Sequence, residues 1–145
     1  MKGRLILGFI CLFVSLLTGC ETSSKYWEGA PALAEGKARI WFYRTGKFWG
    51  GGNQPAMHVG SVVAGNVEPG RAFYIDVPAG DYVLECTGMG WAKCNISLSA
   101  GATKYVRLKL SARSGFEPIG LKEFVIEPVD SETGRAGLKR CKLRT

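Results

Sequence analysis

Residues 71–87 read RAFYIDVPAGDYVLECT and contain two β-strand patterns joined by a turn. Every second residue from Phe73 to Val77 is apolar, and this period of two is typical of a strand that buries one face. The PAGD segment at 78–81 combines a proline of fixed φ with a glycine that tolerates positive φ. The stretch therefore predicts strand, tight turn and strand.

Similar short runs, rich in β-branched and aromatic residues, flank this stretch on both sides. No segment after residue 37 has a convincing apolar stripe at helical spacing, which argues against a helical or α/β fold. We therefore predict an all-β fold, a single immunoglobulin-like or transthyretin-like β-sandwich at 37–145. Its expected strands, seven in number, are 38–44, 57–64, 71–77, 81–87, 95–99, 103–110 and 121–127.

The composition suits one compact domain, since the chain has 145 residues, 46% of them hydrophobic and 21% charged. Its net charge of +7 is unevenly distributed, with +2 from residues 1–19 and +5 from the last eleven residues. The body at 20–134 has equal numbers of acidic and basic residues. Because duplex affinity grows with the number of phosphates neutralised, this pattern argues against nucleic-acid binding.

The N-terminus, MKGRLILGFICLFVSLLTGC, has two basic residues followed by an apolar run at 5–17. Thirteen helical residues span only about 20 Å, less than the roughly 30 Å hydrocarbon core of a bilayer. We therefore predict an export signal peptide at 1–19.

Residues 17–20, Leu-Thr-Gly-Cys, resemble the lipobox of bacterial lipoproteins. The resemblance implies that Cys20 is acylated and becomes the first mature residue, with 20–36 as the acylated cysteine and its tether. Glu21 stands where enterobacterial lipoproteins kept at the inner membrane typically carry Asp, which favours the outer membrane facing the periplasm. The alternative is an ordinary secretory peptide with Cys20 as a plain thiol.

Export to an oxidising compartment favours disulfides among the three remaining thiols, Cys86, Cys94 and Cys141. If 81–87 and 94–99 form a hairpin with Cys86 opposite Cys94, the neighbouring apolar residues also face one another across the strands. This register predicts a Cys86–Cys94 disulfide that closes the loop at 88–91, with pairings to Cys141 as the alternatives.

A zinc site made of these three cysteines and His58 is a further alternative, but the spacing matches no established ligand pattern. We expect no metal and no cofactor. His58 is the only histidine, and no recognised signature surrounds a cysteine, so a catalytic thiol is not indicated. The Gly-rich loop at 48–55 lacks the Gly-Lys-Ser/Thr ending of a phosphate-binding loop.

Two groups of residues are candidates for binding. Trp41 and Tyr43 lie on the polar phase of the first strand, and exposed aromatics there could stack on a sugar or a protein partner, unless they cover the second sheet face. Loops carry two more aromatics, Trp49 and Trp91. The basic end could bind anionic lipid or envelope phosphates, unless it is a solvated or strand-forming terminus; its residues are Arg135, Lys139, Arg140, Lys142 and Arg144.

Four motifs resemble a bacterial family known as domain of unknown function 2846, many members of which look like envelope lipoproteins. The motifs are GKARIWFYR at 36–44, DVPAGDY at 76–82, AGATKYVRL at 100–108 and LKRC at 138–141. The resemblance implies a small β-sandwich and brings no catalytic residues. The second and third motifs also resemble PEGA-type sandwiches, which have the same architecture.

These features favour a membrane-anchored envelope lipoprotein that acts as a non-catalytic binding or structural module for an envelope protein or glycan. One alternative is binding of anionic surfaces through the basic end. Another is an uncharacterised envelope enzyme, for which the chain offers acidic residues such as Asp76, Asp81 and Glu85. Their pattern indicates turns and solvated strand faces instead of a paired-carboxylate site.

Overall fold

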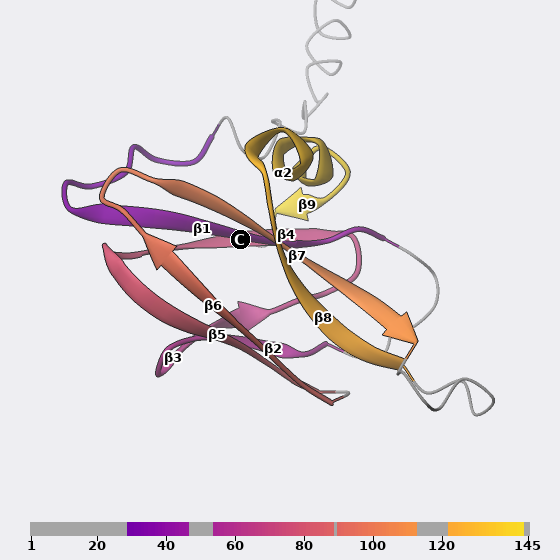
Figure 1. The fold of residues 1–145 in the computed structure, drawn as a ribbon. Coiled ribbons are helices and arrows are strands. Elements are labelled where there is room, and N and C mark those ends of the chain that lie inside the picture. Colours follow the sequence, from indigo (N-terminus) through magenta and orange to yellow (C-terminus); the bar gives the residue numbers. More distant parts are fainter. Residues whose placement is uncertain (1–28, 47–53, 89, 113–121, 144–145) are drawn as a thin grey trace, which may run out of the picture.

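The computed structural model describes residues 29–46, 54–88, 90–112 and 122–143, which form a β-sandwich with one short helix (Figure 1). One sheet, here called sheet A, has five strands in the order β8-β7-β1-β4-β9, and the other, sheet B, has four in the order β3-β2-β5-β6. The elements are β1 (Lys37–Arg44), β2 (Ala56–Val59), β3 (Val62–Asn66), β4 (Arg71–Pro78), β5 (Gly80–Gly88), β6 (Gly90–Leu98), β7 (Thr103–Ala112), β8 (Lys122–Val129), α2 (Ser131–Leu138) and β9 (Lys142–Leu143).

The turn predicted at 78–81 carries the chain from one sheet to the other. β4 ends at Pro78 in sheet A, and β5 begins at Gly80 in sheet B. Gly80 has a φ of 153°, a value that side-chain-bearing residues rarely adopt. Sheet B is antiparallel throughout, whereas in sheet A β1 pairs antiparallel with β4 and parallel with β7.

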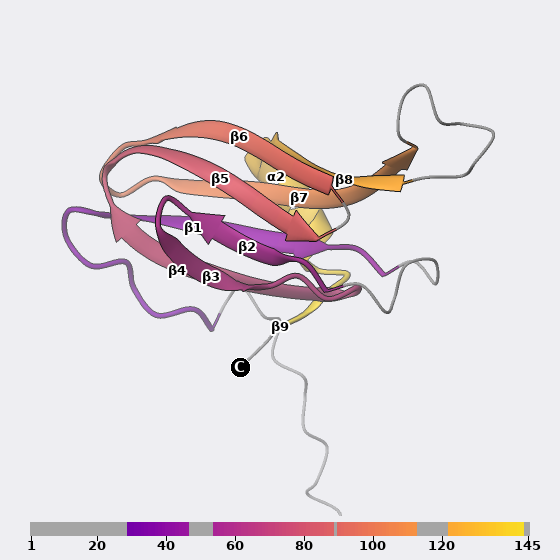
Figure 2. The same cartoon turned by 90° about the horizontal axis from the view of Figure 1, so that it is seen from below.

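The two sheets face each other (Figure 1), and the larger hydrophobic cluster, which we call the inner core, lies between them. Figure 2 looks onto the face of sheet B, with α2 on the far side. Ile40 and Phe42 of β1 and Leu84 of β5 are completely buried there. These residues lie at alternate positions of their strands, as the period-two pattern predicts. The inner core therefore joins the two sheets through apolar side chains.

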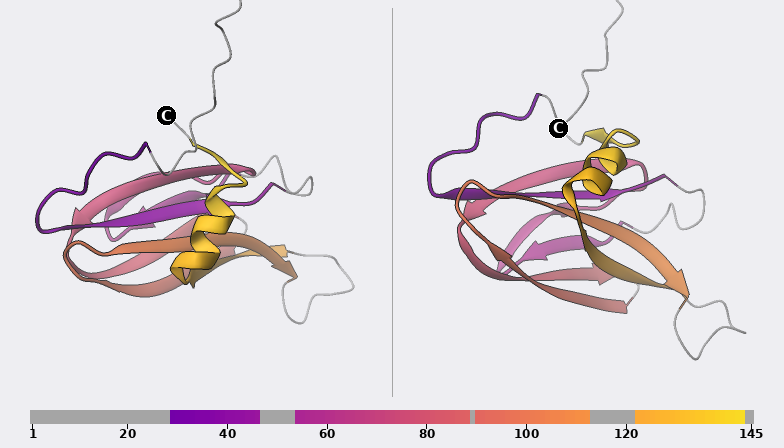
Figure 3. Two further views of the ribbon diagram at one scale, coloured as in Figure 1. Left: turned by 90° about the horizontal axis from the view of Figure 1, so that it is seen from above. Right: turned by 45° about the horizontal axis from the view of Figure 1, so that its top comes forward.

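A second cluster, the outer layer, lies on the opposite face of sheet A, where helix α2 covers the strands (Figure 3). Its buried members are Trp41, Tyr43, Ala72, Tyr105, Leu138 and Cys141. Because sheet A is covered on both faces, β1 is buried along almost its whole length. A sheet with both faces covered loses the simple apolar/polar alternation.

Helix α2 begins at a well-formed cap and packs closely on sheet A. The carboxylate of Asp130 accepts hydrogen bonds from the Thr133 backbone N–H at 2.9 Å and from the Thr133 hydroxyl at 2.7 Å. Two buried glycines, Gly134 and Gly137, face tyrosine rings so closely that a Cβ at either position would overlap the ring. No helical stripe is visible in the sequence here, because this helix is short and has glycines at its contact positions.

The prediction of an all-β sandwich is confirmed, but the described residues contain nine strands instead of about seven. The run predicted at 57–64 divides into the hairpin β2–β3, with Gly60 at a φ of 58° in its turn. Strand β9, which pairs parallel with β4, was not predicted.

The predicted register of the β5–β6 hairpin is wrong by two residues. Cys86 lies opposite Ala92, and Cys94 lies opposite Leu84. The strands extend to Gly88 and resume at Gly90, so the connection is shorter than the four-residue loop on which the prediction rested. Cys86 and Cys94 share one face of the hairpin without being opposed, and both are free thiols in the structure.

Candidate functional site

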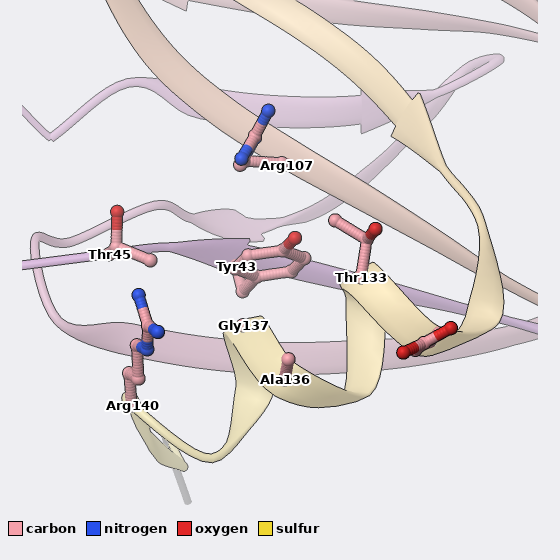
Figure 4. Close-up of a pocket in the computed structure, with 8 residues that line it drawn as sticks. Tyr43, Thr45, Arg107, Thr133, Ala136, Gly137 and Arg140 are labelled. Carbon is pink, nitrogen blue, oxygen red and sulfur yellow. The ribbon is translucent and has the colours of Figure 1, made fainter.

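A pocket of about 320 Å³ lies where α2 meets β1 and β7 on the outer face of sheet A (Figure 4). This volume is at the lower end of the range typical of small-ligand sites. The pocket is lined by Tyr43, Thr45, Arg107, Glu132, Thr133, Ala136, Gly137 and Arg140. Its lining therefore comes from two strands, the helix and the residues just after the helix.

Tyr43 lies at the centre of the labelled residues in Figure 4 and is 1% exposed. Its hydroxyl is buried and has no hydrogen-bond partner among the described residues. An unsatisfied buried hydroxyl costs about 1–3 kcal/mol relative to a satisfied one. The missing side chain of Gly137 makes room for this ring, so the helix is shaped around Tyr43.

The electrostatic surroundings of Tyr43 are of mixed sign. Burial raises the pKa of the phenol, because a phenolate is poorly stabilised away from water. The positive charge of Arg107 acts in the opposite direction and is the largest lowering influence on this pKa. The Tyr43 hydroxyl therefore remains a neutral hydrogen-bond donor within the field of a nearby guanidinium.

Arg107 is held in place by an ion pair with Glu127 on the neighbouring strand β8. Its Nε lies 2.8 Å and its Nη2 lies 2.6 Å from Glu127 Oε2. The hydrogen bond from Arg107 is the main cause that lowers the pKa of the Glu127 carboxyl, and Lys109 adds a contact at 3.2 Å. The remaining guanidinium N–H groups of Arg107 can still donate to another partner.

Arg140 lies just after the end of α2, is exposed, and has no ion pair among the residues that the structure describes. Figure 4 shows it beside Tyr43, below Thr45 in the view. Thr133, on the other side of the ring, donates its hydroxyl proton to Asp130. Glu132 contributes an exposed carboxylate from the first turn of α2.

This arrangement is suited to holding a ligand. Tyr43, Arg107 and Arg140 offer hydrogen-bond donors, and the two arginines remain charged at any physiological pH. Within the described parts of the chain, no group of three or more His, Cys, Asp or Glu residues is placed to hold a metal ion.

The aromatic residues predicted as binding candidates lie in different parts of the fold. Tyr43 lines the pocket, whereas Trp41 is 3% exposed and packs on Tyr74 with ring centroids 4.8 Å apart. Of the two possibilities considered for Trp41, the structure therefore supports coverage of the second face of sheet A over contact with a ligand. Trp91, on β6 of sheet B, is 77% exposed, and Trp49 lies outside the described residues.

The basic end is folded, with Arg135 in α2 and Lys142 in β9. Arg135, Lys139, Arg140 and Lys142 are all exposed, and Arg135 Nε lies 3.5 Å from the Tyr105 hydroxyl. Arg144 lies outside the described residues. Arg140 is the member of the predicted basic group that lines the pocket.

The cysteines and His58 do not form one site. Cys86 lies in the inner core and Cys141 in the outer layer, on opposite faces of sheet A. His58 lies between the inward-facing Met57 and Val59 of β2, so its side chain is on the other face of that strand. The alternative pairings of Cys141 and the proposed zinc ligand set are therefore not supported by this geometry.

The acidic residues named for an enzyme are also dispersed. Asp76 accepts two hydrogen bonds of 2.7 Å from Arg39, and Glu85 lies 2.6 Å from Lys93 Nζ. Asp81 lies on sheet B, in the turn-proximal part of β5. Asp76 and Glu85 are thus each paired with a basic residue of a neighbouring strand, not with another carboxylate.

Sequence reasoning missed Thr45, Arg107, Glu132 and Thr133 as pocket residues. Glu132 and Thr133 lie in α2, and Arg107 of β7 lines the pocket together with them. The helix itself was not predicted from the sequence. The sequence does contain a signal for it, since Asp130 precedes Ser-Glu-Thr and can act as an N-cap. An N-cap alone does not say which strands the helix covers.

The part of the chain that the structure describes contains no helix long and apolar enough to span a bilayer. No family model matches the chain, and no curated protein matches it. The search of solved structures finds the N-terminal domain of AlgF from P. aeruginosa, which is 21% identical. That match covers 67% of this chain and 100% of the other, with a TM-score of 0.40, a value too low to support an inference about this chain.

Proposed function

We propose that this protein is a lipid-anchored lipoprotein of the bacterial envelope whose β-sandwich acts as a non-catalytic binding module. The observation that carries the proposal is the order of segments in the sequence. A basic start, an apolar run, a lipobox-like Leu-Thr-Gly-Cys ending at Cys20 and a tether precede the folded domain. Two or three acyl chains on one cysteine anchor a protein stably, at about 0.8 kcal/mol per buried methylene.

The entry of the tether into the domain supports this proposal. Ala30, close to the first described residue, packs against the outer layer, on the same side of sheet A as α2 (Figure 3). The nine residues from Cys20 to residue 28 could extend over at most about 30 Å. An anchored domain would thus keep its α2 side within that distance of the bilayer.

The pocket residues favour binding over catalysis. Tyr43 is buried with a raised pKa, and the charged groups around it are two arginines and one exposed glutamate. A general base requires a titratable group poised near the operating pH, and nucleophilic catalysis requires an activated nucleophile. The pocket offers hydrogen-bond donors and positive charge, which suit recognition of a ligand.

A Cys20→Ser variant tests the anchor. We expect the wild-type chain to pellet with membranes and to incorporate radiolabelled fatty acid, and the variant to lose both properties. Cys11→Ser is the matched control, since Cys11 lies within the apolar run and should be removed with it. Membrane association of Cys20→Ser at unchanged mass would contradict the proposal.

A second candidate function is electrostatic contact with an anionic surface through the basic segment at 135–142. This segment has four exposed cations and no acidic residue, and it lies on the side of the domain where the tether enters. Each cation near an anionic membrane contributes about 1 kcal/mol. A Lys139→Gln/Lys142→Gln variant without acylation should therefore bind phosphatidylglycerol vesicles more weakly at low salt, and unchanged binding would exclude this contact.

A further inference from the structure

We propose that the pocket over Tyr43 binds the phosphate group of a small phosphate ester, with Arg140, Arg107 and the Tyr43 hydroxyl as its donors. The inference rests on the proposed role as a binding module and adds the chemical class of the ligand. It does not depend on the lipid anchor.

The first support is an unsatisfied donor on a residue that lines the pocket. The Tyr43 hydroxyl is buried, has no partner among the described residues, and belongs to a residue that lines the pocket. Buried polar groups in folded proteins are almost always paired with protein, water or ligand. A ligand oxygen in the pocket would supply the missing acceptor.

The second support is the positive charge that converges on the same space. Arg107 comes from β7 and Arg140 from the segment after α2, so two elements distant in sequence bring guanidinium groups to one pocket. Glu127 neutralises Arg107, while Arg140 has no ion pair in the described parts of the chain. An anion in the pocket would therefore pair with Arg140, and the N–H groups of Arg107 that Glu127 does not use could also donate to it.

The distribution of the donors favours phosphate over carboxylate. Figure 4 shows Arg107, Arg140 and Thr45 at different positions around the Tyr43 ring. A planar carboxylate offers two oxygens, whereas a phosphate group presents three or four in a tetrahedral arrangement. Donors that approach from several directions are satisfied more completely by the tetrahedral group.

The carboxylate of Glu132 favours an ester with a hydroxyl-bearing part over inorganic phosphate alone. Glu132 lies in the first turn of α2, and Arg140 follows the last turn, so the two lie toward opposite ends of the helix. A carboxylate accepts hydrogen bonds and repels phosphate. A ligand such as sn-glycerol 3-phosphate would place its phosphate near the arginines and a hydroxyl near Glu132, within a cavity of about 320 Å³.

Calorimetric titration of the full-length chain in nonionic detergent with sn-glycerol 3-phosphate tests this assignment. We expect saturable one-to-one binding, weakened about tenfold by Arg140→Gln and about fivefold by Tyr43→Phe. Lys104→Gln is the matched control, because it removes an exposed cation that neither lines the pocket nor belongs to the basic segment, and the affinity of this variant should stay within about twofold of the wild type.

Tyr43→Phe also separates a folding defect from a binding defect. It removes a hydroxyl without a described partner and keeps the ring that packs under Gly137, so thermal unfolding should occur at the same or a higher temperature. Weaker binding by a folded Tyr43→Phe protein supports the proposal. Equal affinities of Tyr43→Phe and wild type would overturn it, as would equal losses of affinity in Arg140→Gln and Lys104→Gln.

The source of the phosphate is decided by a second titration, with vesicles of phosphatidylglycerol and of phosphatidylcholine. The Cys20→Ser chain is used, so that loss of anchoring and loss of ligand binding are measured separately. Binding of the soluble ester assigns a soluble ligand, and binding of phosphatidylglycerol vesicles alone, with the same dependence on Arg140 and Tyr43, assigns a lipid headgroup. Binding of neither would overturn the proposal.

Discussion

The inner core and the outer layer lie on opposite faces of the same strand, β1, and differ in what they contain. Ile40 and Phe42 point into the inner core, a cluster of apolar side chains and thiols with one buried cation, Arg44, over the ring of Phe124. Trp41 and Tyr43 point into the outer layer, beside charged residues and a pocket. One strand therefore supports the fold with one face and the candidate site with the other.

The difference shows how a small sandwich can carry a candidate site on a face that is separate from its core. The inner core is enclosed by two sheets, whereas the outer layer is covered by a single helix of eight residues. Elements with fewer buried contacts open more easily than the core. Each prediction below compares a change on one face of sheet A with a change on the other.

The largest effect should come from a matched pair of leucines. Leu84 in the inner core and Leu138 in the outer layer are 0% and 1% exposed. Truncation of a buried leucine to alanine costs about 2–5 kcal/mol, and the cost is lower where neighbours can move into the space. We expect Leu84→Ala to lie in the upper part of this range and Leu138→Ala in the lower part, measured by urea unfolding.

The expected order of the two costs follows from what surrounds each leucine. Helix α2 packs on one face of sheet A and can shift into the space that Leu138 leaves, whereas Leu84 lies between two packed sheets that can move less. Equal losses for the two variants, or a greater loss for Leu138→Ala, would show that α2 is as firmly fixed as the sheets.

Gly137→Ala should have the next largest effect. Alanine favours helix by about 1 kcal/mol over glycine, but its Cβ would overlap the Tyr43 ring, and overpacking costs about 1–3 kcal/mol. We expect a net loss in the free energy of unfolding. In a Tyr43→Ala background the same substitution should stabilise the protein, and a loss in both backgrounds would refute the contact.

The two buried thiols should have a smaller effect, a decrease in the free energy of unfolding at alkaline pH. Burial raises the pKa of Cys86 in the inner core and of Cys141 in the outer layer to about 11, above the usual value of 9.0. The folded chain holds these protons more tightly than the unfolded chain does. The two thiols therefore stabilise the fold fully below pH 9, and this stabilisation is lost as the pH rises toward 11.

We expect each thiol to account for roughly 1–2 kcal/mol of this alkaline loss. Denaturant unfolding of Cys86→Ala and Cys141→Ala at pH 8 and pH 10.5 should show a shallower pH dependence than the wild type. The same slope in all three proteins would contradict the assignment.

The smallest effect should be a local opening of α2 at acidic pH. The hydrogen bond from the Thr133 backbone N–H is the main cause that lowers the pKa of Asp130. The cap is therefore present above about pH 4 and is lost as the pH falls through this lowered pKa.

Amide exchange of residues 131–138 should accelerate relative to the inner-core strands when the pH falls below 4, after correction for the intrinsic exchange rate. In Asp130→Asn, which retains a capping side chain that does not titrate, this additional acceleration should disappear. Its persistence would assign the opening to another group.

Most of the sandwich could be predicted from the sequence, because period-two runs and turn residues report directly on burial and chain reversal. The strand at 71–77 and the turn at 78–81 are examples. The register of β5–β6 could not be predicted in the same way. A shift by two residues keeps every side chain on its face, so the apolar pattern at Leu84 and Cys86 fits both registers.

Only part of the candidate site could be predicted. Tyr43 and Arg140 were identified by residue type, but their meeting in one pocket depends on the packing of α2, which a short segment containing Gly134 and Gly137 does not reveal. Trp41 has the same pattern as Tyr43 and is buried away from the pocket. A periodic pattern identifies the face of a strand, and tertiary packing decides what covers that face.

Hydrogen exchange of the full-length chain, with and without sn-glycerol 3-phosphate, tests the division between the two faces of sheet A most directly. The account predicts slower exchange at 43–45 and 131–140 when the ester is present, and unchanged exchange in β2, β3, β5 and β6. Slower exchange confined to sheet B, or no change anywhere at saturating ester, would contradict it.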